Sequence, residues 1–230
     1  MCGRYATFGP VSLSREARDV LAELEVDLIS EINQRDDQFN IAPTQRAPLI
    51  LHTDDGYHFD MVRWGLVPSW SRDAKIGAKT INARAETVET KPAFRAAFKK
   101  RRCLVPASGY YEWTGQPGSK QPYFIHDPEG QLVMFAGLWE TWRSAENETP
   151  LRTFTVITGE PGRVSGDIHD RQPVILPPDL WEVWLSGTAD EAAATLKVVP
   201  GADLVYHPVA KAVGSPRANS PQLIEPVELP

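Results

Sequence analysis

The sequence predicts a single α+β domain that is rich in β-strands and carries its helices at the periphery. β-Branched and aromatic residues gather in short runs from residue 47 onward. The 230-residue chain contains 20 Pro and 16 Gly, which punctuate these runs, and no stretch has the composition of a flexible linker. No internal repeat or low-complexity tract interrupts the pattern. We therefore expect residues 1–230 to form one compact domain.

Each element follows from its local pattern. Apolar residues recur at helical spacing between Leu13 and Leu28, which predicts an amphipathic helix from Leu13 to Ser30. Strands are predicted at Ala47–His52, Tyr57–Trp64, Cys103–Trp113, Gln121–Asp127, Leu132–Glu140 and Leu151–Thr158. Further helices are predicted at Lys91–Lys100, Pro178–Leu185 and Asp190–Val198. The proline-rich tail, residues 213–230, is expected to wrap around the domain or to fray.

Composition limits the class of protein. With 42% hydrophobic residues the chain can bury a substantial core. Its two cysteines are too few for a disulfide framework, which favours a reducing compartment. No apolar run approaches the roughly 20 residues of a membrane-spanning helix, and the N-terminus lacks the features of a signal peptide. We expect a cytoplasmic protein without a membrane partner, associated with the nucleoid in a bacterium or nuclear in a eukaryote.

Charge argues against a globally basic protein. The chain has 24 Lys and Arg against 30 Asp and Glu, a net charge of -6, whereas nucleic-acid-binding proteins are typically basic. One run departs from this balance with six basic residues and no acid: Lys91, Arg95, Lys99, Lys100, Arg101 and Arg102. Such a run can attract a DNA backbone, or it can be an ordinary solvated face.

Cys2 has the most distinctive chemistry. Because its side chain is small, we expect methionine aminopeptidase to remove Met1 and leave Cys2 with an α-amino group beside its thiol. Positive surroundings such as Arg4 are expected to lower the pKa of the thiol. The amine can condense with an aldehyde to an imine, which the thiol closes to a five-membered thiazolidine. The alternative is an incidental cysteine buried as a small apolar group, our interpretation of Cys103.

Six motifs in consistent order suggest a known family. They are Met1-Cys2-Gly3-Arg4-Tyr5, Phe39-Asn40-Ile41-Ala42-Pro43, Trp64-Gly65-Leu66-Val67-Pro68, Ile81-Asn82-Ala83-Arg84-Ala85-Glu86-Thr87, Gly109-Tyr110-Tyr111-Glu112-Trp113 and Ile168-His169-Asp170-Arg171-Gln172-Pro173. Together they resemble the SRAP (SOS response-associated peptidase) family from Cys2 to about Pro208, with a further likeness from His207 to Gly214. Six ordered motifs over nearly the whole chain are far more specific than one.

The resemblance implies a compact β-rich SRAP fold and a function in the DNA damage response. Family members resembling this chain recognise abasic sites in single-stranded DNA, crosslink to them through the N-terminal cysteine, and are thought to remove their own first methionine or a short leader. The resemblance also implies peptidase activity and a site made of Cys2, Asn82, Glu112 and His169, and an imine left unclosed implies lyase activity. A thiazolidine would consume the imine that otherwise promotes β-elimination, and so would protect the strand.

The residues themselves are compatible with these roles. Strand alternation places Tyr111 and Trp113 on the face opposite Glu112, so that Glu112 can face a pocket where partial burial raises its pKa and makes it a proton donor. His169 lies in a segment dense in turn formers, where it can move a proton near neutral pH. Each residue also has a structural interpretation: a strand-edge carboxylate for Glu112, and a surface histidine bonded to Asp170 for His169.

DNA contacts are expected from a second set of residues. Asn82 can hold a sugar hydroxyl or a phosphate oxygen, or simply stabilise a turn. The DNA-contacting set is predicted to be Arg4, Asn40, Pro43, Trp70, Arg84 and Arg171. Guanidinium groups match phosphate oxygens, and a tryptophan ring can stack on a base. The alternatives are surface salt bridges for the arginines and core packing for the tryptophan.

Three other functions compete. Met-Cys-Gly also begins glutamine amidotransferases of the N-terminal nucleophile class, although no glutamine-site signature follows here. Cys2 could act as a peptidase nucleophile with Glu112 and His169, or it could be inert in a non-enzymatic DNA-binding module. We expect no cofactor, and no metal because the five histidines, at positions 52, 58, 126, 169 and 207, show no ligand spacing. A monomer is expected.

Overall fold

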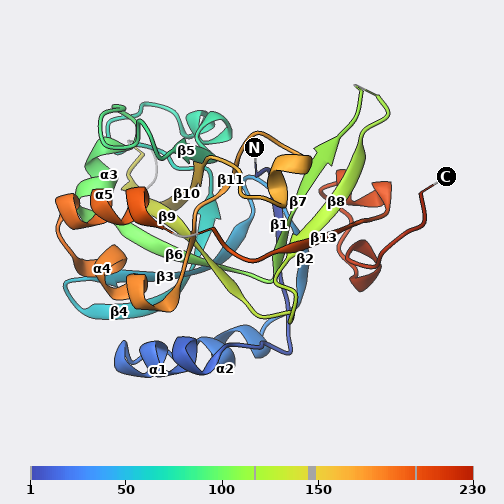
Figure 1. Ribbon diagram of the computed structural model, residues 1–230. Helices are drawn as coiled ribbons and strands as arrows, with labels where there is room; N and C mark the ends of the chain where they lie inside the picture. Colours follow the sequence, from blue (N-terminus) through green and yellow to red (C-terminus); the bar gives the residue numbers. More distant parts are fainter. Residues whose placement is uncertain (1, 117, 145–148, 200, 230) are drawn as a thin grey trace.

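The computed structural model describes residues 2–116, 118–144, 149–199 and 201–229, which build two β-sheets flanked by helices (Figure 1). The strands are β1 (Arg4–Thr7), β2 (Gln38–Ile41), β3 (Arg46–Thr53), β4 (Gly56–Trp64), β5 (Asn82–Arg84), β6 (Arg102–Ala107), β7 (Gly109–Thr114), β8 (Gln121–His126), β9 (Val133–Trp142), β10 (Leu151–Gly159), β11 (Gln172–Pro173), β12 (Ile175–Leu176) and β13 (Val205–Pro208). The helices are α1 (Arg15–Glu23), α2 (Leu28–Asn33), α3 (Arg95–Lys100), α4 (Trp181–Ser186) and α5 (Ala189–Val198). The predicted β-rich α+β class is confirmed.

The larger sheet closes on itself. Its described strands run in the order β11-β10-β4-β3-β6-β9-β12, β5 pairs with β10, and an additional pairing joins β10 to β9. The strands β10, β4, β3, β6 and β9 therefore form a closed ring, a barrel-like arrangement that leaves no open edge among them. All but one of the ring's ladders are antiparallel, the exception being β10 with β4.

The smaller sheet has the order β13-β8-β7-β1-β2, and all its pairings are antiparallel. The N-terminal strand β1 thus lies inside this sheet, between β7 and β2. Residues of β1 alternate between two clusters: Tyr5 packs into the core between the sheets, and Ala6 packs on the other face against Phe39 and Tyr111.

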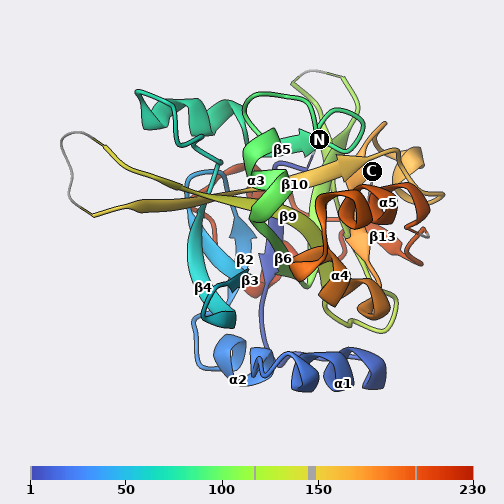
Figure 2. The ribbon, with the colours of Figure 1, turned by 90° about the vertical axis from the view of Figure 1, so that its left-hand side faces the viewer.

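The predicted helix from Leu13 to Ser30 is wrong in its length, because the structure divides it into α1 and α2. Glu25 takes a positive φ of 55° between the two helices, and the Asp27 side chain accepts a hydrogen bond from Ser30 N and begins α2. The apolar spacing continued across this break because both helices bury their apolar faces against the same core cluster. Figures 1 and 2 both show the pair lying below the sheets.

The other helices cover one face of the barrel-like sheet (Figure 2). The helix predicted at Lys91–Lys100 begins only at Arg95, after turns, and the segment Pro178–Leu185 starts as a 3₁₀ turn before α4. The prediction for Asp190–Val198 is confirmed by α5, where Thr188 and Glu191 form a reciprocal capping box. Buried side chains of α3, α4 and α5 join those of α1 and α2 in one core cluster.

The single strand predicted from Cys103 to Trp113 is instead two strands in different sheets. β6 ends at Ala107 in the barrel-like sheet, and β7 begins at Gly109 in the smaller one. At the crossing, Ser108 N donates to Ala6 O (2.8 Å). A Cβ at Gly109 would lie 2.4 Å from the Phe124 ring and 2.7 Å from Ile125 O, so the crossing requires glycine. The remaining predicted strands are confirmed to within two residues at either end.

Candidate functional site

Cys2 lies immediately before β1 and is completely buried. It packs in the core cluster that includes Tyr5, Tyr110 and Phe135, and its Sγ lies 3.8 Å from Arg4 O. Burial raises the pKa of the Cys2 thiol, and the negative charge of Glu112 raises it further. The predicted net lowering of this pKa is therefore wrong: the Arg4 guanidinium binds Val213 O and Gly214 O, and burial outweighs the lowering effect of the Arg4 backbone contact. In this site the sulfur is held as a neutral thiol.

Asn82 holds the backbone of Cys2. It begins β5, which pairs in parallel with β10 through Asn82↔Val156. Its Nδ2 donates to Cys2 O (2.8 Å), joining residues 80 positions apart. Its Oδ1 is buried and has no hydrogen-bond partner among the residues that the structure describes. Asn82 therefore positions Cys2 with one end of its amide and presents an acceptor at the other.

Glu112 lies on β7 with only 2% of its surface exposed. As the alternation predicts, Tyr111 faces the opposite side, where its hydroxyl donates to Phe39 O (2.6 Å). Burial raises the pKa of Glu112, and the charge that His169 can carry opposes this rise. The predicted direction of the shift is confirmed. A carboxyl with a raised pKa keeps its proton more readily and can serve as a general acid.

His169 follows a 3₁₀ turn, Ser165–Asp167, and its backbone N–H donates to Ser165 O (2.8 Å). Its Nδ1 accepts a hydrogen bond from Arg171 N (3.1 Å) and also lies 2.7 Å from Asp170 Oδ1. The first contact needs a lone pair on Nδ1 and the second a proton. The side chain is 28% exposed. The Nδ1 atom therefore lies beside one group that can donate a hydrogen bond to it and one that can accept a hydrogen bond from it, which suits either tautomer of the imidazole.

The comparison with protein families decides the identity. Residues 1–216 match the family described as SOS response associated peptidase (SRAP). The chain belongs to the SRAP family.

Related proteins that align with nearly the whole of this chain support the same family assignment. This SRAP chain is 37% identical over 229 residues to the abasic site processing protein YoqW of Bacillus subtilis, covering 98% of this chain and 99% of that protein. It is 31% identical over 234 residues to the abasic site processing protein YedK of Escherichia coli, covering 99% and 100%. The chicken abasic site processing protein HMCES is 30% identical over 265 residues, covering 100% of this chain and 79% of HMCES.

Solved structures confirm the SRAP fold. A protein of Bacteroides thetaiotaomicron superposes with a TM-score of 0.79 at 26% identity, covering 99% of this chain and 100% of that one. A phage-related protein of Bordetella bronchiseptica gives 0.68 at 28% identity, covering 91% and 95%. The predicted family and fold class are thereby confirmed.

Two predicted DNA-contacting residues of this SRAP chain have intramolecular partners. Arg4 Nη1 donates to Asn40 Oδ1 (2.9 Å) and Val213 O (2.6 Å), and Arg4 Nη2 donates to Gly214 O (3.0 Å). Asn40 is buried and binds the same C-terminal segment. The structure thus places both side chains against protein carbonyls.

The other two arginines differ in accessibility. Arg84 is exposed and, as expected for a strand, lies on the same face of β5 as Asn82. Arg171 makes a two-point ion pair with Glu86, with Nη1···Oε1 at 2.6 Å and Nη2···Oε2 at 2.9 Å, and donates to Thr158 O (2.6 Å). This pairing lowers the pKa of Glu86. Arg84 therefore offers the more available guanidinium for a phosphate.

Trp70 is 60% exposed, and its Nε1 donates to Pro92 O (3.3 Å). Pro43 is half-buried, just after β2. An indole ring with most of its surface exposed is available for stacking on a base. The DNA-contacting roles of both residues stay predictions.

The basic run around α3 separates into two groups. Arg102 is buried and donates to the carbonyls of Trp184, Phe98 and Gly187, and Arg101 pairs with Glu140 at 2.7 Å. These two arginines tie β6 and β9 to the helices. The four remaining cations are exposed: Lys91, Arg95, Lys99 and Lys100.

Sequence reasoning missed Tyr110. It is buried on the face of β7 that also carries Glu112, and burial raises the pKa of its hydroxyl, as does the negative charge that Glu112 can carry. The signal was available, because residues two apart on a strand share a face. Tyr110 forms part of the apolar wall beside the Cys2 thiol.

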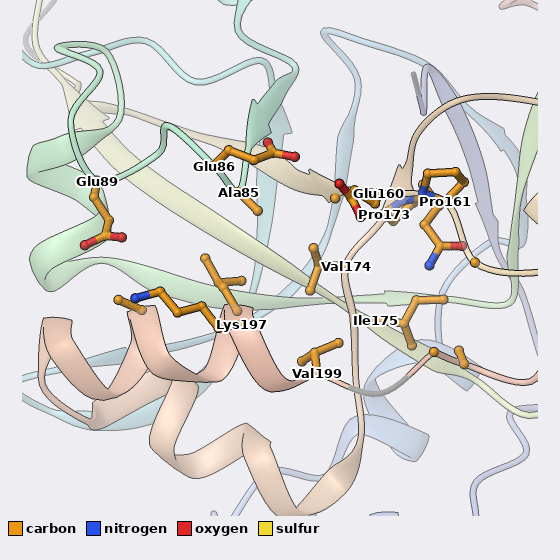
Figure 3. Close-up of a pocket in the computed structure, with 17 residues that line it drawn as sticks. Ala85, Glu86, Glu89, Glu160, Pro161, Pro173, Val174, Ile175, Lys197 and Val199 are labelled. Atoms are coloured by element: carbon orange, nitrogen blue, oxygen red, sulfur yellow. The ribbon is translucent and has the colours of Figure 1, made fainter. Parts of the chain in front are cut away.

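A cavity of about 480 Å³ lies behind the loop that leads to His169, between that loop and α5 (Figure 3). Val174 and Val199 supply apolar lining, and Glu89, Glu160 and Lys197 contribute charge. None of the four predicted catalytic residues lines it. In the described part of the chain, no group of three or more His, Cys, Asp or Glu residues is placed to hold a metal ion. None of the described helices is long and apolar enough to cross a membrane.

Proposed function

We propose that this chain processes abasic sites in single-stranded DNA by forming a covalent thiazolidine crosslink through Cys2. The main observation behind the proposal is that three side chains meet at the buried Cys2. The Asn82 amide holds the Cys2 carbonyl, and the Glu112 carboxyl has a raised pKa and interacts electrostatically with His169. The names of its relatives, which are abasic site processing proteins, support the substrate. The proposal requires that Met1, which lies outside the described residues, is removed.

The first step joins the α-amine of Cys2 to the C1′ aldehyde of the opened deoxyribose. The amine nitrogen adds to the carbonyl carbon and gives a carbinolamine. Loss of its hydroxyl group as water requires a proton, and the protonated Glu112 carboxyl is suited to supply it. The product is an iminium ion, with the Glu112 carboxylate left beside it.

The second step closes the ring. The Cys2 sulfur adds to the iminium carbon, and the thiol proton passes to the Glu112 carboxylate, which restores the acid. A neutral thiol suits this sequence, because its proton is then available when the carbon–sulfur bond forms. The thiazolidine nitrogen ends as a neutral secondary amine, and no oxidant or cofactor is consumed.

His169 and Asn82 serve the sugar. His169 moves the proton that opens the deoxyribose ring to its aldehyde, and the donor and the acceptor beside its Nδ1 fit either tautomer of the ring. The available Asn82 Oδ1 accepts a hydrogen bond from the sugar hydroxyl. Arg84, on the same face of β5, binds a flanking phosphate.

Lyase activity follows from the same intermediate. When the sulfur fails to close the ring, the iminium ion acidifies the neighbouring carbon and the strand breaks by β-elimination. Peptidase activity, in this proposal, is limited to release of Met1 so that the amine of Cys2 is uncovered. The protein acts as a monomer in the cytoplasm or nucleus.

A gel experiment tests the proposal. The purified protein, with removal of Met1 verified by mass, is incubated with a single-stranded oligonucleotide carrying one abasic site and resolved under denaturing conditions. We expect a covalent band with the unchanged protein and with Cys103→Ala, a matched control at the other buried cysteine, and no band with Cys2→Ala. Absence of the band from the unchanged protein overturns the proposal and favours amide hydrolysis, measured as ammonia release from glutamine.

A further inference from the structure

The C-terminal segment, residues 209–227, lies across the face of β1 and β2 that is opposite Cys2; we call it the strap. Val209 pairs with Pro226, and Val227 N donates to Pro208 O (2.9 Å), so the strap is a closed loop whose two ends meet beside β13. Its apolar side chains at Val213 and Leu223 are buried against Ala6 and Phe39. Figure 1 shows it at the outer side of the smaller sheet.

Arg4 fastens β1 to the strap. Side chains alternate along β1, so Tyr5 points into the core that also holds Cys2, whereas Arg4 points toward the strap. The Arg4 guanidinium donates to Val213 O and Gly214 O, 209 and 210 positions away in the chain, and to Asn40 Oδ1. Burial lowers the pKa of Arg4, which is the cost of enclosing a guanidinium between two segments.

Asn40 completes the same junction from β2. Its Nδ2 donates to Val213 O (3.2 Å), Ser215 O (2.9 Å) and Ala218 O (2.9 Å), while its Oδ1 accepts from Arg4. Both polar atoms of this buried amide are therefore occupied by the strap and by Arg4. No donor or acceptor of Asn40 remains for a nucleic acid without breaking these bonds.

The strap is held by other amides as well. Asn219 Oδ1 accepts from Phe39 N (2.7 Å), and Asn219 Nδ2 donates to Asp37 O (2.9 Å). The junction is thus a built arrangement of directed hydrogen bonds between the strap and the two N-terminal strands, in which Arg4 supplies a guanidinium.

We infer that Arg4 and Asn40 are positioning residues for the reaction at Cys2, and that the strap is a structural part of the reactive site. Cys2 and Gly3 precede the first paired residue of β1, Arg4↔Tyr111, and chain ends outside a ladder fray unless they are tied down. The Cys2 carbonyl is tied by Asn82, and its thiol lies against the Arg4 carbonyl. Fastening Arg4 from the far face fixes the point from which Cys2 extends toward Glu112.

This inference, which rests on the proposed function, is tested with Arg4→Met and Arg4→Lys beside Arg15→Met, a matched control at an exposed arginine of α1. Two quantities are measured with abasic single-stranded DNA: the dissociation constant and the crosslinking rate at saturating DNA. We expect both Arg4 variants to crosslink about tenfold more slowly with a dissociation constant within about twofold of the unchanged protein. Lysine keeps the charge but cannot make the three directed bonds.

Hydrogen exchange supplies a readout that needs no DNA. Peptides covering residues 2–7 and 210–219 should both exchange faster in the Arg4 variants and in Asn40→Asp, with no change in Arg15→Met. The inference would be overturned if Arg4→Met bound DNA more weakly, if its dependence of log binding constant on log salt concentration had a slope smaller by about one, and if Arg4→Lys restored binding. Hydrogen exchange would then be unchanged in the Arg4 variants, and Arg4 would be a DNA contact. Failure of the unchanged protein to crosslink overturns the proposed function, whereas the exchange result still decides the role of the strap.

Discussion

Cys2 and Cys103 are both completely buried and both unpaired by a disulfide, yet their surroundings differ in kind. Cys103 lies within β6, paired with Gly137 and Leu51 on neighbouring strands, and burial raises the pKa of its thiol. Cys2 lies just outside a ladder, its carbonyl is held by a side chain, and Glu112 adds to the effect of burial on its pKa. Burial therefore does not distinguish these two cysteines from each other, but their polar neighbours do.

The same contrast holds for two buried acids. Glu140, at the end of the molecule covered by α3, binds Arg101 at 2.7 Å and accepts from Thr141 N at 2.9 Å. Glu112, at the Cys2 end, has a raised pKa and is coupled to a histidine. Glu140 joins β9 to Arg101 at the end of α3 and so serves the fold. An acid whose environment favours its protonated form is prepared for proton transfer.

The largest predicted effect distinguishes the two cysteines by substitution. Cys2→Ser should lose stable crosslinks completely, because no sulfur remains to close the ring, while its amine still forms the imine and cleaves some of the strand. Denaturing gels that resolve crosslinked and cleaved DNA measure both products. Cys103→Ser should crosslink like the unchanged protein. If Cys2→Ser gave no cleaved strand at all, the imine step would lose its support.

The next prediction compares the two acids. Glu112→Gln should slow crosslinking about 100-fold, because an amide cannot donate the proton that removes water. Glu140→Gln should leave the rate within about twofold and instead lower the free energy of unfolding by about 1–3 kcal/mol through loss of the charged hydrogen bonds. Single-turnover rates and urea denaturation measure the two effects. Equal rate losses in both variants would show that Glu112 has no special role.

The pH dependence of stability sharpens the comparison further. A carboxyl whose pKa is raised by folding stabilises the native state below the ordinary Glu range, and this contribution is lost as pH rises through the folded-state pKa. Stability of the unchanged protein should therefore fall, relative to Glu112→Gln, as pH increases from about 4 to about 8. Urea midpoints across this range measure the difference. If the stability of the unchanged protein stayed constant or rose relative to Glu112→Gln with increasing pH, the raised pKa would be contradicted.

The smallest predicted effect concerns His126, the last residue of β8. Burial lowers its pKa, and its ring packs 5.2 Å from that of His207. A base with a depressed pKa contributes stability above about pH 6.5 that is lost as pH falls through its folded-state value. His126→Gln should therefore lose less stability than the unchanged protein between about pH 6.5 and 5. Thermal melts measure this, and identical acid sensitivity would refute it.

Sequence patterns were most informative where the decisive contact is local. Period-two alternation alone placed Glu112 opposite Tyr111, and it would have placed Tyr110 beside Glu112 had it been applied once more. The helix from Leu13 to Ser30 failed because spacing cannot reveal a residue such as Glu25 turning into a positive φ when the apolar register resumes beyond it.

Long-range partners lay beyond the reach of those patterns. Arg4 looked like a phosphate ligand because nothing near it in the sequence offers a partner, and its carbonyl acceptors lie more than 200 positions away. Likewise, the run of six basic residues was interpreted as one surface patch, although the buried Arg102 side chain donates to the carbonyls of Trp184 and Gly187 at the end of α4. Directed hydrogen bonds of this kind are set by the topology, which brings the strap across β1.

The interior position of β1 in the smaller sheet also fixes when this strand can pair during synthesis. This strand has to be seated between β2 and β7, and β7 is made long after β1 leaves the ribosome. Synthesis at roughly 5–20 residues per second puts about a hundred residues, or roughly 5–20 seconds, between Arg4 and its strand partner Tyr111. During that interval Cys2 of the nascent chain is not yet buried by the residues that surround it in the folded protein. Enzymes that trim the N-terminus can therefore reach it first, before the sheet closes over it.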